Sequence, residues 1–352
     1  MKKSLIALAV AGAFAAPAAF AATANVDVYG RLNMFIEDSN GTNITPQVSD
    51  RQSILGFKGT EDLGGGLKAI WQIEQTISGN QDGVGGQTLA NRNSFVGLSG
   101  GFGTFLMGRH DTPYKLATGR LDLFADTVAD YNGDGGALSS AGKDGFTQLV
   151  MNAHDHRSNN AVAYISPNFS GFSFAGAVVM TNRDGGTLAS PQVVDNDANK
   201  MFDAYSLSAT YASGPLFLTA AYQRAEDLVN GGVAPNNKTV SPAWKFGAGY
   251  TFGNARIGFV YEDVEVKTGA TKHVDRSSWM LNGAYAMGPM TLKAQYGRVD
   301  VAGNQDQSKL SLGLDYSLSK RTTAMVIYDM NSTKNNVPGS LNAWSVGMRH
   351  TF

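Results

Sequence analysis

Residues 25–36 read NVDVYGRLNMFI and alternate apolar with polar side chains. Val28 and Leu32 fall on one face of this segment, whereas Asp27 and Arg31 fall on the other. Strict alternation predicts a β-strand, because successive side chains of a strand point to opposite faces. The strand therefore has one apolar face and one wet face.

The same alternation recurs at residues 67–74, 309–318 and 344–352. A soluble sandwich buries such an apolar face against a second sheet, whereas a membrane barrel turns it to lipid and keeps the polar face in the lumen. Alternation alone does not choose between these two folds. The polar set is rich in Gly, Ser, Thr, Lys, Asp and Arg, which favours a wet lumen.

Short and long connections alternate along the chain, and seven short and eight long ones separate sixteen strands. Outer-membrane barrels have this one-sided pattern, with short periplasmic turns and long external loops. We therefore predict an all-β fold, a 16-stranded antiparallel transmembrane β-barrel. The expected long connections are residues 38–50, 78–91, 111–156, 182–201, 227–242, 265–275, 300–307 and 331–341.

Aromatic residues collect near the short turns, which favours an interfacial girdle over ordinary strand propensity. The members of this predicted girdle are Tyr164, Phe172, Tyr211, Phe217, Tyr250, Phe252, Tyr285 and Tyr316.

The first 21 residues have the pattern of a secretory signal peptide. Two lysines precede an apolar stretch from Leu5 to Phe14, and Ala19-Phe20-Ala21 has the small residues of a cleavage site. We expect residues 1–21 to be removed and residues 22–352 to form one barrel domain. No later window approaches the roughly 20 apolar residues that a membrane-spanning helix needs.

The composition argues against several classes of function. The chain has no cysteine, so it holds neither a disulfide framework nor a thiolate metal site. Its formal net charge of −1 gives no excess of positive charge, which argues against nucleic-acid binding. No nucleophile elbow or phosphate-binding loop stands in a suitable context. We therefore expect no catalytic residues, no cofactor and no enzymatic activity.

Residues 111–156 form the longest stretch without a convincing strand, and such long loops are usually functional. Residues 130–135 read DYNGDG, like the start of a calcium loop, but position twelve is Ala141 instead of the required Glu. His154 and His156 have no further His or Cys near them in sequence, so no metal site is predicted. The stretch is acidic, with Asp111, Asp122, Asp126, Asp130, Asp134, Asp144 and Asp155 against Lys115, Arg120 and Lys143.

Six short segments follow one another along the chain: YGR at 29–31, FKGTEDLG at 57–64, VGL at 96–98, GR at 108–109, YISP at 164–167 and RHTF at 349–352. In order and spacing they resemble the general, non-specific trimeric porins of Gram-negative outer membranes. The resemblance spans the chain after the signal peptide. It implies three barrels to an assembly, each with a third external loop that folds inward and narrows a water-filled pore.

The resemblance also implies basic groups on the barrel wall that face acidic groups on the loop. The matching wall positions are Arg31, Lys58, Arg92 and Arg157, and alternation independently places the first two in the lumen. A short helix over residues 116–129 would put two loop acids on one face, directed at the wall or simply solvated. The loop lacks the Pro-Glu-Phe-Gly signature of some porins. The candidate constriction acids are Asp111, Asp122, Asp126, Asp130 and Asp134.

The last strand has an alternating apolar face that ends in phenylalanine, which resembles the signal recognised by the barrel assembly machinery. A simple closing strand is the alternative, and the two readings are compatible. The residues of this predicted assembly signal are Trp344, Val346, Met348, His350 and Phe352.

The predicted function is passive diffusion of small hydrophilic solutes and ions across the cell outer membrane. We expect the chain to form a homotrimer. Its other expected partners are outer-membrane lipid, lipopolysaccharide and the barrel assembly machinery. Loop acids outnumber loop bases, which weakly favours cations, although wall arginines oppose this. Two alternatives stay open: a substrate-selective channel for anions or sugars, and a non-conducting structural or adhesive barrel.

Overall fold

The computed structural model describes residues 25–39, 46–79, 89–131, 155, 157–180, 192–193, 201–226, 228–229, 239–268, 271–302, 306–333 and 341–352. The predicted signal peptide lies outside these ranges, as do Asp134, His154 and His156.

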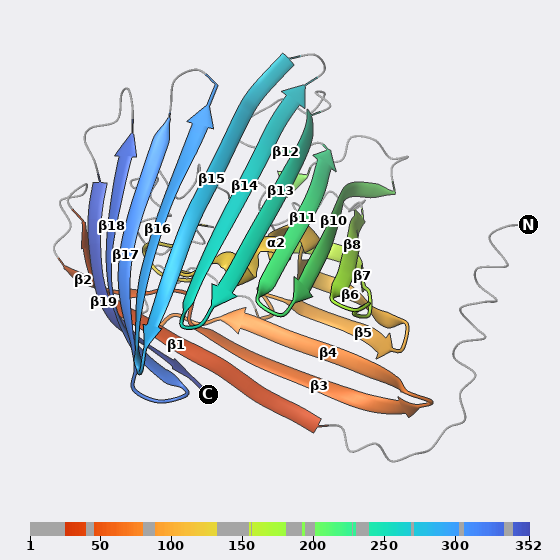
Figure 1. Ribbon diagram of the computed structural model, residues 1–352. Coiled ribbons are helices and arrows are strands. Elements are labelled where there is room, and N and C mark those ends of the chain that lie inside the picture. Colours follow the sequence, from red (N-terminus) through yellow and green to blue (C-terminus); the bar gives the residue numbers. More distant parts are fainter. Residues whose placement is uncertain are drawn as a thin grey trace, which may run out of the picture.

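Sixteen long antiparallel strands form one closed barrel in the described part of the chain (Figure 1). Consecutive long strands are neighbours in the sheet, and β1 pairs with both β3 and β19, which closes the ring. The strands are β1 Asn25–Ser39, β3 Ile54–Gly64 (extended by the short β2 Gln47–Asp50), β4 Leu67–Thr76, β5 Ser94–Gly100, β6 Gly103–Asp111, β7 Arg157–Ile165, β8 Phe172–Met180, β10 Phe202–Ser213, β11 Leu216–Glu226, β13 Thr239–Phe252, β14 Ala255–Thr268, β15 Thr271–Met287, β16 Met290–Val301, β17 Gln307–Ser317, β18 Thr322–Thr333 and β19 Leu341–Thr351.

Apolar side chains of the strands point outward, and polar ones point into the lumen. In β1, Val28 and Ile36 are 57% and 50% exposed, whereas Asn33 and Glu37 are 0% and 1% exposed. This arrangement is the reverse of a soluble sandwich, so the predicted barrel and its face assignment are confirmed.

A bulge separates β2 from β3 and shapes the lumen wall beside β1. Met34 lies opposite Asp50 and Arg31 lies opposite Ile54, so one more residue is used on the second strand than on the first. The extra residue is accommodated at Gln52, whose φ is 66°. Its carbonyl oxygen accepts a hydrogen bond from Arg31 Nε at 2.9 Å, which holds that guanidinium in place.

The predicted long connection over residues 265–275 is wrong. β14 and β15 continue their pairing through Glu265 opposite Asp275, as far as Thr268 opposite Thr271. Charged residues on both faces hid these strand ends from a pattern that depends on apolar alternation. The result is a tall wall at β13, β14 and β15, while β5 to β8 stay short (Figure 1).

The aromatic residues of the outer face occupy two levels. Seven of the eight predicted girdle residues lie on this face, but Phe217 is 9% exposed and points into the lumen, where it packs with Leu121. A second outward-facing set lies toward the loop ends of the strands and includes the neighbouring rings of Tyr222 and Trp244, whose centroids are 4.3 Å apart. Its members are Tyr205, Tyr222, Trp244, Tyr261, Trp279, Tyr296, Tyr328 and Trp344.

The helical content is small. The structure contains α2 Pro113–Thr118 and the 3-10 turn η1 Gly119–Leu121, and none of its described helices has the length and apolar character needed to span a bilayer. A separate pair of very short strands, β9 Gln192–Val193 and β12 Leu228–Val229, lies outside the barrel sheet.

Aromatic rings of β1 lie over glycines of neighbouring strands on the lumen face of the barrel. The ring of Phe35 covers Gly347, and the ring of Tyr29 covers Gly56, so closely that a Cβ on either glycine would overlap the ring. Glycine is therefore required at these positions to let the ring reach the backbone of the adjacent strand.

We predict that Gly347→Ala destabilises the barrel by about 1–3 kcal/mol, because the added methyl group overpacks against Phe35. The measurement is the unfolding temperature of the purified barrel in detergent. Gly101→Ala is the matched control, since nothing lies within 4 Å of its added Cβ. Equal unfolding temperatures for the two variants would contradict the prediction.

Candidate functional site: the inward-folded loop and the lumen wall

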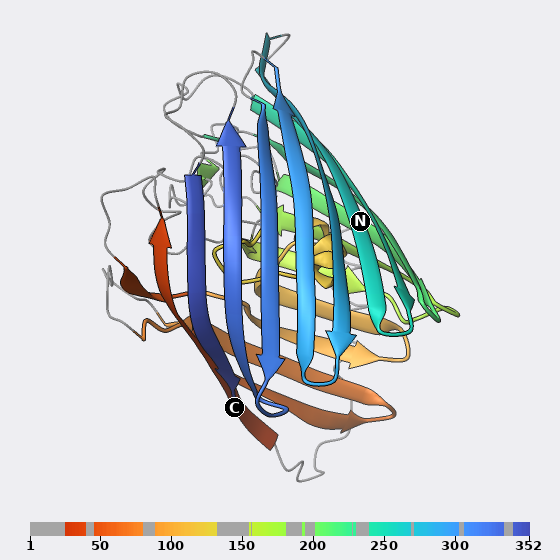
Figure 2. The same ribbon diagram turned by 60° about the vertical axis from the view of Figure 1, so that its left-hand side comes forward.

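The segment after β6 folds into the barrel and follows the lumen wall (Figures 1 and 2). α2 and η1 contact β10, β11, β13 and β14. The hydroxyl of Thr112 caps α2 by accepting the amide N–H of Lys115 at 3.3 Å, and Pro113 takes the first helical position. The predicted inward fold of the third loop is confirmed for residues 112–131.

The predicted helix over residues 116–129 is wrong. The α-helix ends at Thr118, and after Leu121 the chain turns irregularly, with a φ of 57° at Asp126. Asp122 and Asp126 therefore do not share a helix face.

Most backbone carbonyl groups of residues 121–130 accept hydrogen bonds from the wall, whereas that of Thr127 accepts the N–H of Asp130 at 3.2 Å. Six lumen side chains from five strands donate to them, and the shortest of these bonds runs from Gln295 Nε2 to the carbonyl of Ala129 at 2.5 Å. Because the wall satisfies these carbonyls, the segment needs no helical hydrogen bonds. The donors are Asn33, Asn282, Lys293, Gln295, Lys309 and Arg349.

A buried ionic cluster anchors both ends of the loop. Tyr114 of α2 donates its hydroxyl to Glu262 Oε1 at 2.7 Å. The ammonium group of Lys245 bonds to Asp155 Oδ1 at 2.5 Å and lies 4.4 Å from the Tyr114 ring centroid. Burial raises the pKa of Asp155 to about 7, although Lys245 opposes the shift. The entry and the exit of the loop thus meet at one point on β13 and β14.

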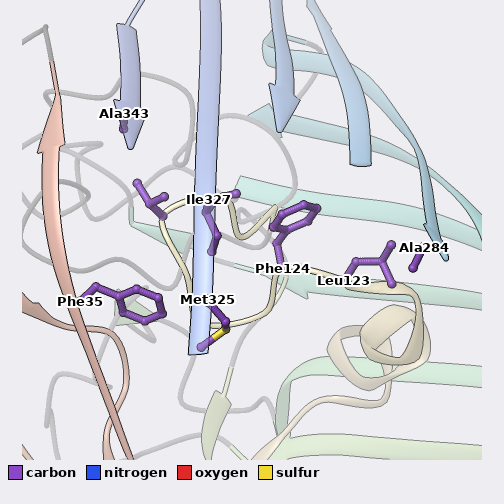
Figure 3. Packing of buried hydrophobic residues seen from close by; sticks show 9 residues of the cluster. Phe35, Leu123, Phe124, Ala284, Met325, Ile327 and Ala343 are labelled. Carbon is purple, nitrogen blue, oxygen red and sulfur yellow. The ribbon is translucent and has the colours of Figure 1, made fainter. Parts of the chain in front are cut away.

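Apolar contacts attach the middle of the loop to the opposite wall (Figure 3). Phe124 is fully buried against Met325 and Ile327 of β18, together with Phe35 of β1. The absence of a side chain at Gly313 leaves room for the Phe124 ring, because an added Cβ would lie 2.7 Å from it. This cluster lies inside the lumen, where alternation predicts polar residues.

Of the candidate loop acids, Asp126 meets a predicted wall base. Its carboxylate bonds to Arg31 at 2.7 Å, and both side chains are 19% exposed. Asp111 pairs with the predicted base Arg157 at 3.2 Å and with Lys115 at 3.3 Å.

Asp122 and Asp130 are directed toward the loop itself. Asp122 accepts the N–H of Phe124 at 2.9 Å, and Asp130 accepts the N–H of Asp126 at 2.7 Å. Burial, and then the neighbouring Asp130 carboxylate, hold the pKa of Asp122 well above its usual range. This shift favours the neutral form of the Asp122 carboxyl group.

The remaining predicted wall bases differ in their partners. Arg92 bonds to Glu74 at 2.7 Å within the wall, and Lys58 lies on the lumen face with its ammonium 5.3 Å from the centroid of the Tyr29 ring. Neither contacts a loop acid.

Sequence reasoning missed two arginines beside the loop, Arg256 and Arg349. Arg120, which the sequence analysis counted among the loop bases, lies on the loop itself in η1. Arg349 lies opposite the lumen residue Asn33 and donates to its Oδ1 at 3.1 Å. Arg256 lies opposite the lumen residue Ala284. Alternation places both arginines on the polar face, but their nearness to the loop depends on the fold.

We predict that Phe124→Ala loosens the loop, because removal of a buried phenylalanine costs roughly 3–5 kcal/mol of packing. Amide hydrogen exchange of residues 122–131 should accelerate while exchange of the strands stays unchanged. Phe174→Ala on the outer face, where the ring is 50% exposed, is the control. Unaltered exchange in the Phe124 variant would show that the polar bonds alone hold the loop.

Comparison with known proteins gives the family. The model of the Gram-negative porin family matches residues 7–336. The chain is 31% identical to the major outer membrane protein P.IB of Neisseria meningitidis over 100% of both chains, and 29% identical to outer membrane porin protein 32 of Delftia acidovorans over 92% and 87%.

Solved structures share the fold. The anion-selective porin from Comamonas acidovorans superposes with a TM-score of 0.77 at 24% identity, covering 94% of this chain and 100% of that one. OmpT of Vibrio cholerae in its trimer form gives a TM-score of 0.67 at 16% identity, covering 94% and 99%. The chain belongs to the Gram-negative porin family and is an integral outer-membrane channel for small solutes.

Proposed function

We propose that this porin is a homotrimer whose pores conduct small hydrophilic solutes by passive diffusion and prefer anions. The observation that carries the preference is the imbalance of charge around the loop. Among the described residues, three arginines there have no carboxylate partner, whereas Asp111 and Asp126 pair with bases and Asp122 favours its protonated form.

Arg120, Arg256 and Arg349 supply the positive charge. Arg120 lies over the Phe217 ring with its guanidinium carbon 4.8 Å from the centroid. Arg349 donates to the Asn33 side chain and to loop carbonyls. In the described part of the chain, neither these two nor Arg256 forms an ion pair with a carboxylate. Positive charge in a confined pore attracts anions.

The loop acids offset less charge than their number indicates. Asp126 is paired with Arg31, and Asp111 lies between Arg157 and Lys115. Asp122 favours its protonated form beside Asp130. Counting loop residues alone thus overstates the attraction for cations.

Similar proteins support the two finer parts of the proposal. The porin from Comamonas acidovorans is described as anion-selective, and OmpT of Vibrio cholerae has a trimer form. The aromatic and apolar outer face suits lipid, and the belt near the loop ends suits the headgroup level where lipopolysaccharide lies.

The seam between β1 and β19 supports an assembly role for the terminal strand. The backbone of Phe352 exchanges two hydrogen bonds of 3.1 Å with Gly30, and its ring covers that glycine. The other assembly-signal residues, Trp344, Val346, Met348 and His350, alternate with lumen residues such as Ser345 on the same strand.

We predict that the reversal potential under a potassium chloride gradient indicates preference for chloride. Asp126→Asn should strengthen this preference, because it frees the charge of Arg31. Asp122→Asn should change the preference less than Asp126→Asn does, because burial and the neighbouring Asp130 favour the neutral form of the Asp122 carboxyl group. Cation preference in the wild-type protein would refute the proposal.

Arg256→Gln should weaken the chloride preference, because it removes an unpaired charge from the lumen. Arg298→Gln is the matched control, since Arg298 lies opposite Trp279 on the outer face and pairs with Asp300 at 2.7 Å. An equal change in both variants would mean that total charge, and not lumen charge, sets the preference.

We predict that deletion of Phe352 lowers the fraction of assembled trimer, because it removes the closing contact at Gly30. Heat-dependent migration in a detergent gel measures the trimer and the folded monomer separately. Phe352→Tyr is the control. It keeps an aromatic ring at the terminal position and should retain assembly. Unchanged trimer yield after deletion would argue against the role.

A further inference from the structure

A cavity lies inside the lumen between α2 and the wall formed by β7, β8 and β10. Its volume is about 190 Å³, and it is partly open to the pore. Leu116, Ala163, Ile165 and Ala175 supply apolar surface. Because Ala163 lies opposite the buried lumen residue Leu106, this part of the wall faces inward.

Leu116 is the exposed residue of α2. It is 49% exposed, whereas Tyr114 and Ala117 are 0% and 5% exposed. Leu116 lines the cavity and is not covered by the wall. An apolar side chain exposed beside an apolar cavity in an aqueous pore is a feature that binding sites share.

Arg120 follows Leu116 by one helical turn. Thr118 departs from helical dihedral angles between them, but both side chains are exposed. Arg120 lies over Phe217, whose strand partner Ala212 belongs to β10, the strand that also lines the cavity. The Arg120 side chain is exposed and, within the described residues, has no carboxylate partner. Its guanidinium carbon lies 4.8 Å from the centroid of the Phe217 ring.

We propose that the cavity and Arg120 form a subsite for small aromatic monocarboxylates. The aromatic ring enters the cavity against Leu116, and the carboxylate binds the guanidinium of Arg120. This proposal rests on the proposed function, because the solute reaches the subsite only through a conducting lumen.

The size and the charge of the site fit such a solute. A dry apolar cavity of about 150 Å³ holds one benzene ring, so the present cavity accommodates a single ring. An arginine without a carboxylate partner matches the planar carboxylate through paired hydrogen bonds. The hydroxyl groups of Ser208 and Thr210 line the cavity and leave room for a polar ring substituent.

The test uses single trimers of the full-length protein in a planar bilayer with potassium chloride. Benzoate, which is ionised at neutral pH, should cause concentration-dependent blocking of the chloride current. Acetate carries the charge without the ring, and benzyl alcohol carries the ring without the charge. Neither should block at the concentrations at which benzoate does.

Variants locate the blocking site. Arg120→Gln should weaken the apparent affinity for benzoate about tenfold, because it removes a charged hydrogen-bond donor. Leu116→Ala should weaken it roughly fivefold through lost apolar contact. Arg298→Gln, which removes a charge from the outer face of the barrel, should leave the affinity unchanged.

The outcomes separate this proposal from the proposed function. A folded trimer without potassium chloride conductance refutes the proposed function. Normal conductance without benzoate block, or with equal block in all variants, refutes the subsite alone. Equal block by benzyl alcohol means a site for neutral aromatic solutes, and equal block by acetate means a simple anion site; each overturns the proposal.

Discussion

The position of the loop depends on hydrogen bonds from wall side chains to loop carbonyl groups. Asn282, Gln295 and Arg349 donate to residues 121–130 from three different strands, and an unsatisfied carbonyl in this buried position would be costly. These bonds replace the internal bonds of a helix, so the chain can follow the curvature of the barrel. Phe124 reinforces the attachment by filling the space above Gly313. The closed barrel thus serves as the scaffold that holds an irregular segment in one conformation.

This attachment changes the electrostatics of the pore. The wall cations Lys293 and Lys309 direct their ammonium groups at loop carbonyls and also pair with wall acids, so their charge is locally compensated. The loop acids are compensated as well, by Arg31 or by protonation at Asp122. The field in the lumen therefore depends on the few groups that lack a partner. Formal charge counted along the sequence is a poor guide to it.

Apolar residues have two different roles in this barrel. On the outer face they meet lipid and are about half exposed, as Val28 and Ile36 are. In the lumen, Met325, Ile327 and Phe35 are buried because the loop covers them. The loop therefore has its own small core within a channel. Beside α2 that core is incomplete, and the cavity at Leu116 remains.

The sequence by itself determined the barrel. Connection lengths that alternate between short and long indicated sixteen strands. Alternation in residues 25–36 and 344–352 indicated which face each side chain occupies, because side-chain direction in a strand follows a period of two. Arg31 and Lys58 were placed in the lumen for the same reason. Only the tertiary structure decided the conformation of residues 112–131 and the partners of Asp122 and Asp126. Wall groups that bond to this segment come from strands up to 224 residues away in sequence, as with Arg349 and the carbonyl of Ala125, and local periodicity holds no information about such contacts.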